Sequence, residues 1–177
     1  GNENYYVASA SKWLAAAVVI SVVDDGLLTL GSTVGQWFPA YAGTQKGAIT
    51  LAQLFSHTSG MAWTTNACVG DQSTTLAACV DVLLAADLAA PPGTQFAYGG
   101  NSMQVAARMA ELATGQTWGT LARERLIGPL GLTKTWWTGA NPHVAGGAAS
   151  TQADYDRFLS VIQSGGTRFG VRLLSPE

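Results

Sequence analysis

Apolar residues recur along this chain mostly with helical spacing, and the longest apolar run begins close to the N-terminus. Residues 9–24 have almost no polar face, and Gly26 follows in a position where helices end. A helix that is apolar all round is normally central in a fold. We therefore expect residues 9–24 to form a buried central helix. The core positions expected on it are Trp13, Leu14, Val18 and Ile20.

Further helical segments follow, separated by glycine and proline turn signals. Gly115 stands where a left-handed cap ends a helix, and Thr151 with Asp154 resembles a capping box that starts another. Strands are scarce, and only 27–30 and 167–174 favour them, so either the protein is all-α or its sheet lies outside this sequence. The expected helices cover 50–55, 75–86, 102–113, 117–127 and the segment from 151 to the glycines at 165 and 166.

Composition limits the class of protein. The 177 residues are 47% hydrophobic and 11% charged, which is typical of one compact domain with a large core. Nine basic and eleven acidic residues leave no basic face for nucleic acid and no polybasic patch for a membrane, so we expect a small-molecule or peptide partner. The most apolar stretch, 13–23, is too short for a transmembrane segment.

The cysteines and histidines bear on location and on metal binding. Cys68 and Cys79 lie 11 positions apart and form either a disulfide or two free thiols. A bridge would favour an exported protein, and we expect secretion or a periplasmic location. Residues 1–6 lack the features of a signal peptide, so any such signal has been removed or was never present. Two histidines 86 positions apart and two cysteines give no metal-ligand spacing, so no metal or other cofactor is expected.

A serine and a lysine stand at the start of the apolar run. Ser9 and Lys12 are three residues apart, so on a helix their Cβ atoms lie roughly 5–6 Å apart on one face. Lysine can take the serine proton if desolvation on an apolar helix lowers the lysine pKa. Backbone N–H groups at the helix N-terminus would favour negative charge on an attacked carbonyl oxygen. The alternative is that Lys12 reaches from the first helical turn to the surface without a catalytic role.

A tyrosine offers a second candidate group. Tyr98 lies in a glycine-rich turn before an apolar helix, where a phenol near an ammonium group can shuttle a proton, although it could equally pack against that helix. His57 is a weaker candidate, because the neighbouring Ser56 points elsewhere and no Gly-x-Ser-x-Gly elbow exists. His143 is a loop residue with no visible partner. Buried packing is favoured over a cleft position for the tryptophans Trp63, Trp136 and Trp137.

Five segments in order along the chain resemble one protein family. They are SASK (9–12), LFSHTSG (54–60), PPGTQFAY (91–98), LIGPLGLTKT (126–135) and AGGAASTQADYDRF (145–158). Together they resemble the penicillin-recognising serine hydrolases, which include class C β-lactamases, D-alanyl-D-alanine carboxypeptidases, D-aminopeptidases and β-lactamase-like esterases. The resemblance implies an α/β (α+β) fold of the β-lactamase/transpeptidase type, of which this chain covers mostly the helical part. It also implies that residues 1–177 are a single incomplete domain without its N-terminal and C-terminal sheet strands.

The resemblance assigns roles to three residues. Ser9 becomes the nucleophile that forms a covalent acyl-enzyme with an amide, β-lactam or ester carbonyl, and Lys12 and Tyr98 move its proton. The family's Tyr-x-Asn reads Tyr98-Gly99-Gly100 here, with Asn101 one residue late. Gly100 and Asn101 are therefore the candidate substrate-binding positions. The departure favours an esterase or peptidase over an efficient β-lactamase.

The third family motif, Lys-Thr-Gly or His-x-Gly on an edge strand, has no counterpart in this sequence. In the family that strand supplies a second oxyanion-hole N–H, a group whose loss costs about 2.7–4 kcal/mol in enzymes. We therefore expect the isolated chain to be a poor catalyst unless a second chain or self-association completes the sheet. The alternative function is an inactive fragment or relative that acts as a binding or interaction module and exposes apolar area. A small all-α binding protein with a chance Ser-x-x-Lys is the third hypothesis.

Overall fold

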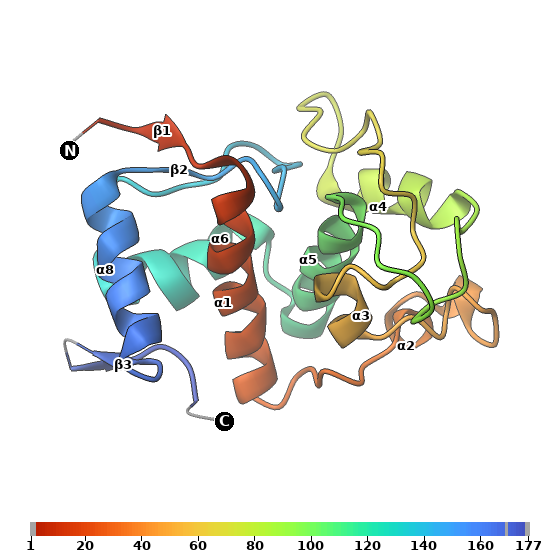
Figure 1. The fold of residues 1–177 in the computed structure, drawn as a ribbon, viewed down its shortest axis with the longest axis horizontal. Helices are drawn as coiled ribbons and strands as arrows, with labels where there is room; N and C mark the ends of the chain where they lie inside the picture. The colour runs from red at the N-terminus through yellow and green to blue at the C-terminus, as the bar shows by residue number, and fades with distance from the viewer. Residues whose placement is uncertain (1–2, 169, 176–177) are drawn as a thin grey trace.

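Helix α1 (Ser11–Asp24) runs through the middle of the molecule (Figure 1). The computed structural model describes residues 3–168 and 170–175. A 3-10 turn, η1 (Ala8–Ala10), leads directly into α1, so the expected helix begins as a tighter turn. Leu14 and Val18 are fully buried, which confirms two of the expected core positions.

The other two expected core positions on α1 need correction. Trp13 is 59% exposed, and Ile20 is only partly buried. Both residues lie on sides of α1 that no described element covers completely. Because α1 is apolar all round, hydrophobic periodicity could not indicate which of its faces is packed.

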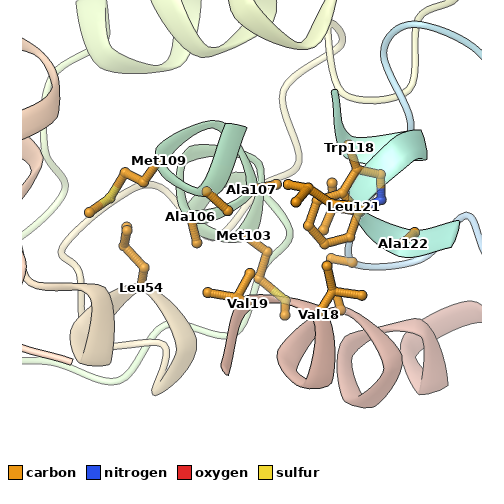
Figure 2. Close-up of a cluster of buried hydrophobic side chains, with 14 of the residues drawn as sticks. Val18, Val19, Leu54, Met103, Ala106, Ala107, Met109, Trp118, Leu121 and Ala122 are labelled. Carbon is orange, nitrogen blue, oxygen red and sulfur yellow. The ribbon is translucent and has the colours of Figure 1, made fainter. Parts of the chain in front are cut away.

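Helix α5 (Asn101–Thr114) packs against α1 and forms the second half of the core. Figure 2 shows Met103 near Val18 and Val19 of α1, while Ala106 and Ala107 face the neighbouring helices. The helix ends at Gly115, whose φ of +70° confirms the predicted left-handed cap. The expected range of 102–113 was therefore correct to within one residue at each end.

The remaining helices are α2 Val34–Trp37, η2 Pro39–Tyr41, α3 Leu51–Phe55, α4 Leu76–Ala85, α6 Trp118–Ala122, η3 Arg123–Ile127, α7 Gly128–Leu130 and α8 Gln152–Gln163. Helices α3, α4 and α8 and the run from α6 to α7 confirm segments expected from periodicity, whereas α2 and η2 lie where no helix was expected. Threonine side chains cap α3, α4, α6 and α8 by accepting a hydrogen bond from the backbone three residues later. The segment expected as one helix over 117–127 is α6, a π-helical turn η3 and α7. No helix among residues 3–168 and 170–175 has the length and hydropathy to cross a membrane.

Two short antiparallel pairs make up the strands of the described residues. β1 (Tyr5–Tyr6) pairs with β2 (Ala149–Ser150), a pairing too short to give a period-2 pattern in the sequence. β3 (Thr167–Arg168) pairs with β4 (Val171–Arg172), within the expected strand segment 167–174. The strand expected at 27–30 was wrong, because these residues form a turn and loop after α1.

The β1–β2 pair brings two distant parts of the chain together beside the start of α1 (Figure 1). The Val7 N–H donates to the Ala148 carbonyl at 2.9 Å, and the Ala148 N–H donates to Ser11 Oγ at 3.0 Å. A disulfide joins Cys68 to Cys79 of α4 and decides between the two alternatives left open by the sequence. It ties the loop before α4 to a buried helix.

The two neighbouring positions Trp13 and Leu14 test which face of α1 is packed. Leu14→Ala should lower the free energy of unfolding by about 2–5 kcal/mol, because it leaves a cavity in the core. Trp13→Ala should change it by about 0.5 kcal/mol or less, since this side chain is mostly exposed. Urea unfolding followed by circular dichroism measures both. Equal losses would show that Trp13 is packed in solution.

Candidate active site

Three residues that the sequence singled out, Ser9, Lys12 and Tyr98, meet in one cleft. The cleft has a volume of ≈ 540 Å³ and opens where α1 and α5 begin. Segments from four parts of the chain form its walls. Its lining residues are Ala8, Ser9, Lys12, Trp63, Thr64, Thr65, Tyr98, Gly99, Gly100, His143, Ala145 and Gly146.

Lys12 is directed at the candidate nucleophile. Its Nζ donates a hydrogen bond to Ser9 Oγ at 3.2 Å and a second one to the Ala145 carbonyl at 3.1 Å. The Ala145 bond holds the amine in place from the opposite wall of the cleft. This Nζ···Oγ contact is the direct path for a proton between the two side chains. The geometry therefore fits a nucleophile–base pair within hydrogen-bond reach.

Tyr98 lies beside this pair. Its ring centroid is 4.6 Å from Lys12 Nζ, and half of the side chain is exposed to the cleft. Interaction with the Ser9 hydroxyl, followed by that with Lys12, lowers the pKa of the Tyr98 phenol from its usual value. A lowered pKa makes the phenolate easier to reach, so Tyr98 can both accept and return a proton here.

The backbone on both sides of the cleft is strained. Ala8, directly before Ser9, has a φ of +45°, and His57 has a φ of +60°. Residues other than glycine rarely adopt this left-handed region, and such strain is characteristic of functional sites. At Ala8 the strained turn sets the approach of the chain to α1 and leaves the Ser9 side chain exposed in the cleft.

His57 packs behind Tyr98. The two rings lie 4.6 Å apart, and Phe96 contacts His57 edge-on from another side at 5.8 Å. Burial, and then the charge of Lys12, lower the pKa of His57, which therefore stays neutral at pH 7. The Ala97 N–H donates to the His57 carbonyl at 2.8 Å, and this bond fixes the turn that carries Tyr98. His57 thus supports Tyr98 by packing.

The two candidate substrate-binding positions separate in the structure. Gly100 lines the cleft, whereas the buried Asn101 side chain does not. The Asn101 amide donates to the carbonyls of Ala62 and Thr64 at 2.9 Å each and accepts from the Asn66 N–H at 2.9 Å. These bonds use both the oxygen and the nitrogen of the side-chain amide. The expectation for Asn101 is therefore corrected: it holds the loop that forms one cleft wall.

His143 and Trp63 are cleft residues that sequence reasoning missed. Trp63 is 67% exposed at the rim, contrary to the expected burial. His143 lies on the wall, where burial, and then the charge of Lys12, lower its pKa. No sequence signal marked His143, because its close contact with Gly146, where a Cβ would lie 2.9 Å from the His143 ring, arises only in the folded chain. Within residues 3–168 and 170–175 no group of three or more potential ligands could hold a metal ion.

Comparisons with known proteins agree on one family. The model of the Beta-lactamase family matches residues 1–170. Penicillin-binding protein 4 of Amycolatopsis lactamdurans is 33% identical over 127 residues. A proposed beta-lactamase of Bacteroides dorei DSM 17855 superposes with a TM-score of 0.90 at 40% identity, and the D-alanine carboxypeptidase AmpC of Burkholderia cenocepacia superposes with a TM-score of 0.76 at 25% identity.

The chain spans only part of each of these relatives. The match to Penicillin-binding protein 4 includes 70% of this chain but 33% of that protein. The two structural matches include 99% and 91% of this chain and 55% and 50% of theirs. The mostly helical structure agrees with the expected partial β-lactamase/transpeptidase-like fold. The expected limits of the domain stay a prediction.

Asn101 offers a test of how the cleft wall is held. Asn101→Ala should lower the free energy of unfolding by about 1–3 kcal/mol, because it leaves partly buried backbone groups of residues 62, 64 and 66 without partners. It should also speed proteolysis of the loop 62–75. Asn4→Ala serves as the control, since Asn4 is exposed and makes a single bond to the Lys134 carbonyl. Equal effects of the two variants would contradict the role given to Asn101.

Proposed function

Because the chain belongs to the Beta-lactamase family of hydrolases, we propose that it is a serine hydrolase that acts through a covalent acyl-enzyme on an amide, β-lactam or ester carbonyl. The observation that carries this proposal is the convergence of Ser9, Lys12 and Tyr98 in one cleft. Lys12 Nζ lies 3.2 Å from Ser9 Oγ, and the Tyr98 ring lies beside both. No cofactor takes part in the proposed reaction.

Acylation begins when Ser9 Oγ attacks the substrate carbonyl carbon. The serine proton passes to Lys12, with Tyr98 as a partner in the transfer. The carbonyl oxygen becomes negatively charged and accepts a hydrogen bond from the Ser9 backbone N–H, which lies in the first helical turn. When the tetrahedral intermediate collapses, the bond to the leaving group breaks. Tyr98 or Lys12 then gives the proton to the leaving amine or alcohol.

Deacylation repeats these steps with water. Lys12 and Tyr98 take a proton from a water molecule, whose oxygen attacks the ester carbonyl on Ser9. The Ser9 Oγ is the leaving group and takes the proton back. The products are the carboxylic acid and the free enzyme, and the sum of both halves is hydrolysis of one acyl bond.

The substrate class is narrowed by one feature of the cleft. Gly100 replaces the family's asparagine, which favours an ester or a peptide over efficient β-lactam hydrolysis. Relatives with this fold include a D-alanine carboxypeptidase and, at 22% identity and a TM-score of 0.79, a D-amino acid amidase of Ochrobactrum anthropi.

The disulfide between Cys68 and Cys79 supports an oxidising location, and we propose that the protein is secreted or periplasmic.

A second candidate function rests on an apolar groove beside the cleft. The groove has a volume of ≈ 750 Å³ and shares Ser9, Lys12 and Tyr98 with the cleft. Its apolar lining is Trp13, Phe55, Met103, Tyr155 and Leu159. It would make the chain a catalytically inactive interaction module, and the partner proposed for this apolar groove is a second copy of the chain. Sedimentation at low and high protein concentration tests the interaction module against the serine hydrolase, since the module requires a concentration-dependent dimer.

Covalent labelling tests the proposed nucleophile. A fluorophosphonate probe should add one mass increment to the chain, and peptide mapping should place it on Ser9. Ser9→Ala should abolish the increment, because the reactive oxygen is gone. Ser56→Ala, which removes another exposed serine hydroxyl, should leave it unchanged. Labelling that survives in Ser9→Ala would move the nucleophile elsewhere.

The pH dependence of labelling tests Tyr98. The deprotonated phenol is the form that accepts a proton, so the labelling rate should rise with pH through the Tyr98 pKa. Because Ser9 and Lys12 lower that pKa, the midpoint should lie below the usual value of about 10. In Tyr98→Phe this rise should disappear and the rate at neutral pH should fall by about 10²-fold or more. An unchanged pH profile in Tyr98→Phe would assign the proton transfer to Lys12 alone.

A further inference from the structure

Gly100, two residues after Tyr98, has no side chain. Gly100 has φ −101° and ψ −19°, a backbone conformation open to any residue, so its conformation does not demand glycine. A Cβ built on Gly100 would lie 3.2 Å from His143 Nε2, 3.6 Å from Ala145 Cβ and 3.8 Å from Thr65 Oγ1. The missing side chain therefore leaves room for the imidazole of His143.

The segment that carries His143 is held firmly against the cleft. Gln104 of α5 donates to the Pro142 carbonyl at 2.9 Å and accepts from the Val144 N–H at 2.8 Å, so the backbone on both sides of His143 is fixed. The absence of a Cβ on Gly146 also allows close contact, because a Cβ there would lie 2.9 Å from His143 Cε1 and 3.2 Å from Nε2. Nε2 thus points toward Gly100 from a defined position.

The imidazole is equipped to bind a polar group. Within residues 3–168 and 170–175 neither ring nitrogen of His143 has a hydrogen-bond partner, and the ring lines the same cleft as Ser9 and Lys12. A neutral imidazole has one N–H donor and one acceptor nitrogen. An asparagine amide also offers a donor and an acceptor, so the two groups can serve the same substrate atoms.

We propose that His143 replaces the asparagine missing from Tyr98-Gly99-Gly100 and binds a carbonyl group of the substrate next to the scissile bond. This inference rests on the proposed function, because it concerns the same cleft. It assigns the chain to substrates whose acyl part carries a polar group close to the reacting carbonyl, such as N-acyl amino acid esters or amides. His143 and Gly100 act as one unit, in which the small residue makes room for the large one.

A pair of esters of equal length tests the specificity. The p-nitrophenyl esters of N-acetylglycine and of pentanoic acid differ in the amide group, and their acylation rates are followed by nitrophenolate release and by the mass of the chain. We expect the N-acetylglycyl ester to react faster. His143→Ala should lower the ratio of the two rates about tenfold, as expected for the loss of one hydrogen bond to the substrate. His143→Asn, which keeps a donor and an acceptor, should retain most of the ratio.

A swap of the two residues separates substrate binding from a structural role. Gly100→Asn alone should lower the ratio, because its Cβ crowds His143. In the double variant Gly100→Asn with His143→Ala the vacated space is open to the asparagine, and the ratio should recover. Equal slowing of both esters by His143→Ala, or no recovery in the double variant, would overturn the proposal.

A binding measurement tests the proposal without a chemical reaction. The chain has two histidines, so its imidazole ¹⁵N spectrum is simple, and a His57→Gln variant assigns the signals. N-acetylglycine methylamide should shift the His143 nitrogens, and pentanamide should not. No shift would refute the role of His143. Absence of Ser9 modification by either ester or by the fluorophosphonate would instead refute the proposed function, so the two failures are distinguishable.

Discussion

The packing of α1 against α5 is the contact on which the cleft depends. Both helices bury more than half of their residues, with Met103 of α5 near Val18 and Val19 of α1 (Figure 2), and both begin at the cleft. α1 therefore delivers Ser9 and Lys12, and the turn before α5 delivers Tyr98 and Gly100, to the same place. The core side chains between the helices are buried and closely packed, so a shift of either helix would cost packing energy across the whole interface. The relative position of Ser9 and Tyr98 is thus set by the hydrophobic core.

Local sequence signals predicted the parts of the structure that depend on neighbouring residues. The cap at Gly115, the threonine cap at Thr151 and the spacing of Ser9 and Lys12 are all decided within a few residues, and the structure has each of them. The buried face of α1 depends on residues far away in the chain. Trp13 and Leu14 are both apolar, and only their distant neighbours make one exposed and the other buried.

The candidate site shows the same division between local and distant causes. Family resemblance singled out Ser9, Lys12 and Tyr98, which belong to short motifs and lie together in one cleft, while their catalytic roles stay a proposal. It failed for Asn101, whose chemical type fits a substrate site but whose partners are backbone groups about 35 to 39 residues away. The reverse holds for His143. Its neighbours in the sequence show no partner, and its position in the cleft follows only from the space next to Gly100 in the folded chain.

Buried amides connect the core to the cleft walls. Gln104, on the buried face of α5, donates to Asn141 at 3.3 Å, and Asn141 donates in turn to the carbonyls of Cys68 and Asp71 at 2.6 Å and 3.0 Å. Both amides are fully buried, so each broken bond would leave a polar group without water. The loop around Cys68 is further tied by its disulfide. The cleft walls are irregular loops, and these bonds hold them to α5. A wall without regular secondary structure can therefore present His143 in a fixed position beside Ser9 and Lys12.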